Sequence, residues 1–167
     1  MIIVCGLRAA PGLVLQHKVG AAIGILGPET AHPEFPSLSE QQRLRLSFND
    51  VNAAADGMVT ATESDAQQMI AFIKAWDQKA PMLIHCWAGI SRSTATAFSA
   101  LCILRPHEDE MGLARELREA SASATPNRLI VAKVDAALGR QGRMLRAVES
   151  IGRGADAFDG TAFNLKV

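Results

Sequence analysis

Residues 83–94 read Leu-Ile-His-Cys-Trp-Ala-Gly-Ile-Ser-Arg-Ser-Thr. A short apolar run precedes this loop after Pro81, and residues 94–104 behind it are apolar on nearly every side. Short apolar runs bounded by turn residues are typical of buried strands, and a helix that is apolar all round is typical of a protein interior. We therefore predict a buried strand that leads through a tight loop into a buried helix.

The loop has the composition of an anion-binding cradle. Backbone N–H groups at the start of a helix converge on one concavity, and the helix dipole adds partial positive charge there. A glycine lets the backbone approach a ligand closely, and a guanidinium matches the geometry of phosphate oxygens. We expect the phosphate ligands to be the Arg92 side chain and the backbone of five loop residues, which are Trp87, Ala88, Gly89, Ile90 and Ser91.

Cys86 stands at the mouth of this predicted cradle. A thiol at a helix N-terminus and beside a cation ionises more readily than a free cysteine, and the thiolate is the nucleophilic form. Sulfur and phosphate would share one axis, as in-line phosphoryl transfer requires. The alternative is a small buried thiol that packs at a strand end, with an unrelated surface arginine nearby.

The run His85-Cys86, five residues, Arg92 and Ser93 resembles the signature loop of the cysteine-dependent protein tyrosine phosphatases. Its form His-Cys-x-Ala-Gly-x-Ser-Arg-Ser is most similar to the dual-specificity branch, in a small single-domain chain of bacterial type. The resemblance covers roughly residues 2–138, includes the pair Pro126-Asn127, and weakens beyond. It implies hydrolysis of phosphomonoesters through a phosphocysteine intermediate.

This resemblance implies a role for each site residue. Cys86 would attack phosphorus while Arg92 and the loop amides hold the equatorial oxygens, and the Ser93 hydroxyl would hydrogen-bond the departing sulfur. We expect His85 to order the loop from behind the nucleophile rather than to carry a proton. No cofactor and no metal is implied.

Cleavage of a phosphate ester also needs a proton for the departing oxygen, and the cradle itself offers no acid. The resemblance places this acid on an aspartate in a loop upstream of the cysteine. Asp50 follows a predicted strand, and Asn49-Asp50 resembles the family pattern, although the spacing then requires a small insertion in residues 51–61. We favour Asp50, with Asp56 in the following loop as the alternative acid.

The substrate is the least determined part of the prediction. Because Trp87, Ala88 and Ile90 carry no positive charge, inositol phosphates are disfavoured. A phosphotyrosine protein, with phosphoserine or phosphothreonine as further targets, is the main expectation, and small phosphomonoesters follow. Trp87 is either a hydrophobic lip of the site or a packing residue. A phosphopeptide-binding module without turnover is the competing function, and a sulfurtransferase is third.

Length and charge limit the remaining classes. The 167 residues predict one domain, 1–167, with residues 154–167 as a C-terminal tail packed by Phe158 and Phe163. Lys and Arg number 17 and so do Asp and Glu, which does not favour nucleic acid or an anionic membrane as a partner. The N-terminal apolar run is too short for a signal peptide and has no basic leader, and no run reaches membrane-spanning length.

The cysteine count indicates a reduced setting. Cys5, Cys86 and Cys102 form no evident disulfide framework and no metal-ligand spacing, so we expect a cytoplasmic protein. We interpret Cys5 and Cys102 as packing residues. The alternative is that one of them resolves oxidised Cys86 as a disulfide. The oligomeric state is left open.

Strand-like and helix-like segments alternate along the chain. This predicts an α/β fold with a central, mainly parallel sheet of about four to five strands and helices on both faces. Cys86 should then lie at the carboxyl end of a central strand, and the period-two segment 43–48 should be a half-exposed edge strand. The other strands are expected at 2–5, 22–26 and 82–84, and helices at 11–21, from Thr62, 94–104, from Pro106, from Pro126 and near Met144.

Overall fold

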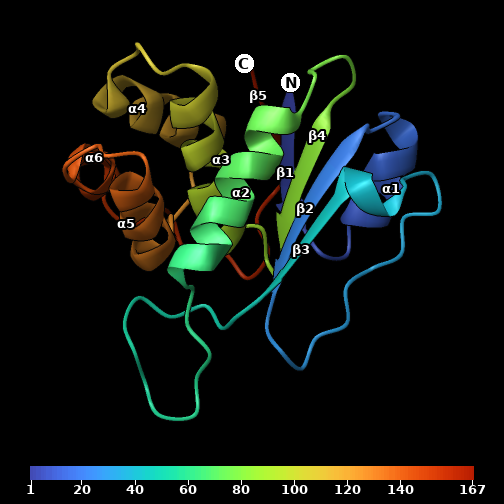
Figure 1. Ribbon diagram of the computed structural model, residues 1–167, viewed down its shortest axis with the longest axis horizontal. Coiled ribbons are helices and arrows are strands. Elements are labelled where there is room, and N and C mark those ends of the chain that lie inside the picture. The colour runs from blue at the N-terminus through green and yellow to red at the C-terminus, as the bar shows by residue number, and fades with distance from the viewer.

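The computed structural model describes residues 1–167 and shows one five-stranded sheet in the order β3-β2-β4-β1-β5 (Figure 1). Four strands are mutually parallel, and the short last strand runs antiparallel to β1. The prediction of a mainly parallel sheet is therefore confirmed, with β4 at its centre and β3 at one edge. The strands are β1 (Ile2–Gly6), β2 (Ala21–Leu26), β3 (Arg43–Ser47), β4 (Met82–Cys86) and β5 (Phe163–Leu165).

Helices cover both faces of the sheet, as predicted (Figure 1). One face packs against α1 (Ala10–Gln16) and the loop that precedes the short 3-10 helix η1 (Glu40–Gln42). The other face carries the larger apolar core and the remaining helices. No helix is long and apolar enough to cross a membrane. The helices on this larger face are α2 (Glu63–Ala75), α3 (Arg92–Leu104), α4 (Glu110–Ala120), α5 (Arg128–Ala137) and α6 (Arg143–Ile151).

The helix starts follow from side chains that cap them. The Asp65 N–H donates to Thr62 Oγ1 over 3.1 Å, and Asp65 Oδ2 accepts from the Thr62 N–H over 2.7 Å, which forms a reciprocal capping box. Asn127 caps α5 in the same position, where its Oδ1 accepts from the Ile130 N–H over 3.0 Å. The predicted starts of α2 and α5 are therefore confirmed.

Two predicted helix boundaries are wrong. The helix expected at 11–21 ends at Gln16, because Lys18 adopts a positive φ of 48° and turns the chain toward β2. Pro106 lies in the turn before α4 rather than in its first turn, since the Asp109 side chain accepts from the Gly112 N–H and caps the helix there.

The tail is held by a strand rather than by two aromatic side chains. Phe158 is 85% exposed, so the expectation that it packs the tail is wrong. Phe163 lies in β5 against the main core, and Leu165 is buried. Alternation along β5 turns these two residues to the core, whereas Phe158 belongs to a segment without strand pairing.

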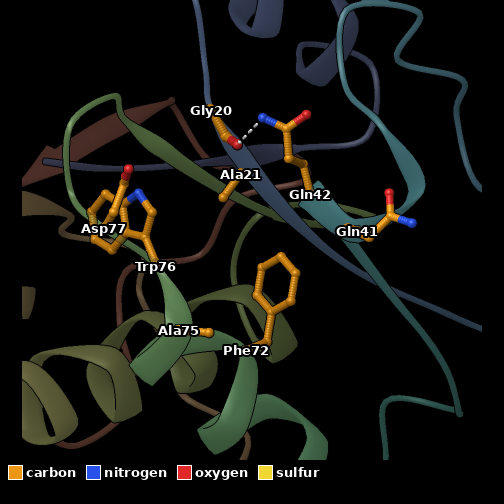
Figure 2. A pocket seen from close by; sticks show the side chains of 8 residues that line it. All are labelled: Gly20, Ala21, Gln41, Gln42, Phe72, Ala75, Trp76 and Asp77. Atoms are coloured by element: carbon orange, nitrogen blue, oxygen red, sulfur yellow. Dashed lines mark hydrogen bonds between the residues drawn. The ribbon is translucent and has the colours of Figure 1, made fainter.

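A pocket of about 250 Å³ opens between the C-terminal end of α2 and the start of β2 (Figure 2). It lies at the amino end of the sheet strands, opposite the carboxyl end where Cys86 sits. Two of its side chains form hydrogen bonds inside the protein: Gln42 Nε2 donates to the Gly20 carbonyl over 2.9 Å, and Trp76 Nε1 donates to the Ala80 carbonyl over 3.0 Å.

Candidate active site

Cys86 ends β4 at the centre of the sheet and faces the first turn of α3. Its Sγ lies 3.1 Å from Ser93 Oγ and accepts a hydrogen bond from the Gly89 N–H over 3.3 Å. The side chain is nearly enclosed, with 2% of the residue exposed. The predicted position at the carboxyl end of a central strand is confirmed, which is where open α/β sheets bind ligands.

The predicted phosphate loop, residues 86–92, is fixed by the carbonyl groups that it points outward. Four carbonyl groups of the loop each accept a hydrogen bond from a backbone N–H of another segment, over N···O distances of 2.8–3.3 Å. Since N–H and C=O point in opposite directions across a trans peptide, the following amides are turned toward the inside of the loop. The donors are the backbone N–H groups of Leu7, Gly160, Thr125 and Asn127, and they bond the carbonyls of Trp87, Ala88, Ile90 and Ser91, respectively.

Only glycine fits at position 89. Its φ is +75°, and a Cβ there would lie 2.6 Å from the backbone nitrogen of Gly6 and 2.7 Å from the carbonyl carbon of Cys5. Both the backbone angle and the close approach of β1 exclude a side chain. The loop is thus pressed against the end of the neighbouring strand, which limits its freedom to open.

Arg92 is buried at the start of α3 and points toward the end of β3. Its Nη1 donates to the Phe48 carbonyl over 2.8 Å, and its Nε lies 3.6 Å from Asp50 Oδ2. Nε has no hydrogen-bond partner although it is buried. The guanidinium is therefore oriented by the chain just before Asp50 and keeps donors for an anion in the loop.

Asp50 is brought into the site by three partners. Its Oδ1 accepts from Ser91 Oγ over 2.7 Å and from Asn127 Nδ2 over 2.8 Å, while Oδ2 faces Arg92. Asp56, in contrast, is exposed, and its side chain makes no hydrogen bond or ion pair. Of the two candidate acids, the structure brings Asp50 to the loop.

Sequence reasoning missed the contacts of Ser91 and Asn127 with Asp50. Ser91 was expected to contribute only its backbone, and Asn127 was noted only as part of a family pair. The Asn127 amide also donates to the Val51 carbonyl over 3.1 Å, so one side chain caps α5 and holds both the Asp50 carboxylate and the Val51 backbone. The distance along the chain between these residues left no local signal for the contact.

His85 lies on the face of the sheet opposite Cys86, because side chains alternate along β4. Its ring packs edge-on against Phe35 and His32, with ring centroids 5.9 and 6.5 Å away, and against Gly24, where a Cβ would lie 2.7 Å from Nε2. Burial lowers the pKa of His85 to about 4, so the ring is neutral near pH 7. His32 comes from a proline-rich loop, in which nothing in the sequence indicates this contact.

Trp87 is 55% exposed, which favours the lip over the packing role. An exposed apolar residue also pairs with the residue just before Asp50. Val59, 49% exposed, is fixed there because its N–H donates to Asn49 Oδ1 over 2.8 Å and its carbonyl accepts from the Asn49 N–H over 2.8 Å. No cluster of three or more metal-ligating side chains exists in the structure.

Cys5 and Cys102 differ from Cys86 in their surroundings. Both are buried as free thiols, and burial raises the pKa of each to about 12. Cys5 belongs to the apolar cluster on the α1 face, whereas the Cys86 side chain faces α3. This arrangement gives no support to a disulfide between Cys5 and Cys86.

We expect iodoacetamide to modify one thiol of the native protein at pH 8, at Cys86, because burial raises the pKa of the Cys5 and Cys102 thiols to about 12 and keeps them protonated. Peptide mass spectrometry after alkylation measures this. Inorganic phosphate, which would fill the loop, should slow the reaction. Labelling of Cys5 or Cys102 at a rate similar to Cys86 would contradict the prediction, and the unfolded protein, which should react at all three, is the control.

The sequence matches no protein-family model and no curated protein. Solved structures, however, have the same fold. Human DUSP28 superposes with a TM-score of 0.62 at 18% identity, over 84% of this chain and 94% of that one. DUSP15 superposes with a TM-score of 0.63 at 17% identity, over 89% of this chain and 90% of that one. The human tyrosine phosphatase-like serine/threonine/tyrosine-interacting protein superposes with a TM-score of 0.61 at 18% identity, over 84% of this chain and 92% of that one.

These similarities cover most of both chains at low identity, and they concern the arrangement of the backbone. They agree with the expectation from residues 85–93, which was reached from a short motif alone. The chain has the fold of the dual-specificity phosphatases.

Proposed function

We propose that this protein hydrolyses phosphomonoesters through a phosphocysteine intermediate, with phosphotyrosine proteins as its main substrates. One observation carries the proposal. Cys86 Sγ lies at the base of a loop whose amides face inward, with the Arg92 guanidinium and the Asp50 carboxylate beside it. A nucleophile, a cation and a candidate acid around one phosphate-sized loop form the constellation that phosphoryl transfer needs.

In the first step the Cys86 thiolate attacks phosphorus. An S–P bond forms while the P–O bond to the leaving group breaks, and Asp50 gives its proton to the departing oxygen. Arg92 and the loop amides carry the charge on the equatorial oxygens. Substrate phosphate competes with Asp50 for the Arg92 guanidinium, now 3.6 Å from the carboxylate.

In the second step water attacks the phosphocysteine. Asp50, now ionised, accepts a proton from the water, an O–P bond forms, and the S–P bond breaks to release inorganic phosphate. The Ser93 hydroxyl, 3.1 Å from Sγ, donates to the departing thiolate and stabilises it as a leaving group. The cycle returns to the starting enzyme without a cofactor.

The rim of the site favours a phosphate carried on an apolar or aromatic group. Trp87 is exposed at the loop, and Met58 and Val59 are each 49% exposed in the segment after Asp50. No side chain of residues 87–91 is basic, so a second phosphate on the substrate would meet no cation from the loop. A phosphotyrosine side chain fits these surroundings better than an inositol phosphate.

A phosphate-binding module without turnover is the second candidate. Asp50 is held by Ser91, Asn127 and Arg92 at once, and an acid fixed in this way would have to release these partners before it protonates a leaving group. One solved structure with the same fold is a tyrosine phosphatase-like interacting protein. Both functions would use the same loop.

The two candidates separate in one experiment. Hydrolysis of p-nitrophenyl phosphate, a phosphotyrosine peptide and a matched phosphoserine peptide is followed by phosphate release, and binding of the two peptides by calorimetry. Turnover of the phosphotyrosine peptide supports the phosphatase. Binding without turnover of any substrate supports the module, and neither binding nor turnover would reject both.

A further inference from the structure

The chain after α6 crosses the outside of the phosphate loop. Residues 156–161, here called the arch, run between two anchored stretches. Before the arch, the Ala155 N–H donates to the Ala122 carbonyl over 2.9 Å. After it, β5 pairs with β1 from Ile2 to Val4, and Leu165 is buried. The arch is therefore fixed at both ends even though Phe158 in its middle is exposed.

The arch contacts the loop at Gly160. Its N–H donates to the Ala88 carbonyl over 2.8 Å. A Cβ at this position would lie 3.0 Å from the Gly89 carbonyl oxygen and 3.2 Å from Ile90 Cγ1, closer than ordinary van der Waals contact. Gly160 does not adopt a left-handed φ, so the loop, and not the backbone angle, is what leaves no room for a side chain.

This contact acts on the peptide that holds the nucleophile. The Ala88 carbonyl and the Gly89 N–H belong to one peptide plane and point in opposite directions. Gly160 holds the carbonyl end outward, and the N–H end donates to Cys86 Sγ over 3.3 Å. Rotation of this plane would remove the donor from the sulfur and turn a carbonyl dipole toward the phosphate position.

We propose that the arch is a positioning element of the active site, in which Gly160 locks the Ala88–Gly89 peptide with its N–H toward Cys86. The idea rests on the proposed phosphate-binding role of the loop, and it extends the site to a segment beyond residues 2–138, whose sequence resembles the phosphatases. The nearest neighbours of Gly160 are loop atoms of residues 88–90 rather than the sulfur, so it acts through the loop. An inward N–H at this position serves both the thiolate and the bound oxyanion.

The test compares Gly160→Ala with the wild-type protein. The added methyl group must push the loop by a few tenths of an ångström, and small displacements of catalytic groups are costly in rate. We expect kcat/KM for p-nitrophenyl phosphate to fall by about tenfold, with a similar loss of tungstate affinity. Alkylation of Cys86 at pH 7 should also slow, whereas the thermal midpoint should change little. Gly12→Ala is the matched control, because a Cβ at Gly12 meets nothing within 4 Å.

Tungstate binding and alkylation separate this proposal from the proposed function, since both can be measured on a protein without turnover. A folded Gly160→Ala variant that matches the wild type in both would overturn it. If the variant does not fold, amide exchange of the wild-type protein decides. Tungstate should slow exchange of the Gly160 N–H more than that of the Ala155 N–H, which bonds Ala122 instead of the loop. Equal effects on the two amides would reject the proposal.

Discussion

Replacement of Cys86 by serine should abolish turnover while the protein still binds phosphate. A serine hydroxyl has the size of the thiol but is a far weaker nucleophile without an adjacent base, and the side chain near Sγ is the Ser93 hydroxyl rather than an imidazole. The loop amides and Arg92 stay in place, so oxyanion binding should remain. We expect kcat to fall by roughly 10⁴-fold or more, as for other nucleophile deletions.

Calorimetry with tungstate and phosphate-release kinetics measure the two effects of Cys86→Ser separately. Cys102→Ala is the matched control, because Cys102 lies inside α3 with its pKa raised to about 12 by burial and has no part in the proposed reaction. That variant should keep its turnover per folded molecule. Hydrolysis by Cys86→Ser within tenfold of wild type would rule out the cysteine mechanism.

Replacement of Asp50 by asparagine should give the second largest loss. The amide keeps the size of the side chain but has no proton of suitable acidity to give to the leaving oxygen. General acid catalysis contributes about 10² to 10⁴ in rate, so we expect kcat to fall within that range. The loss should be smaller for p-nitrophenyl phosphate than for phenyl phosphate, because nitrophenolate leaves readily without a proton.

Asp56→Asn is the matched control for this prediction, since Asp56 is exposed and its side chain has no bonded partner. It should retain wild-type kinetics with both esters. Kinetics against pH complete the measurement: the limb of the profile that reports the acid should disappear in Asp50→Asn only. If Asp56→Asn showed the larger loss, the acid would be reassigned from Asp50 to Asp56.

The sequence predicted the sheet and the loop well, because local signals mark them. The apolar run before Cys86, the glycine at 89 and the apolar helix behind Arg92 are all adjacent in the chain, and their pattern is specific. Thr62 with Asp65 likewise marked the start of α2 through a contact within one turn. Such signals depend on neighbouring residues, which a sequence displays directly.

What the sequence did not reveal depends on contacts between distant segments. The amide of Asn127 meets Asp50 across more than seventy residues, and the N–H of Gly160 meets Ala88 at a similar separation. The expectation that Phe158 packs the tail is wrong, because the pairing of β5 with β1 already holds this tail and Phe158 stays exposed. Tertiary contacts of this kind produce no periodic pattern in the sequence from which they could be predicted.

The phosphocysteine intermediate is the central claim, and rapid acid quench of the wild-type protein with p-nitrophenyl phosphate tests it most directly. Peptide mass spectrometry of the quenched protein should find one phosphoryl group, on Cys86, within the first turnover. Ser93→Ala, which removes the donor 3.1 Å from Sγ, should increase the trapped fraction. Release of phosphate with no phosphoryl group on Cys86 at any quench time, or with the group on another residue, would contradict the mechanism.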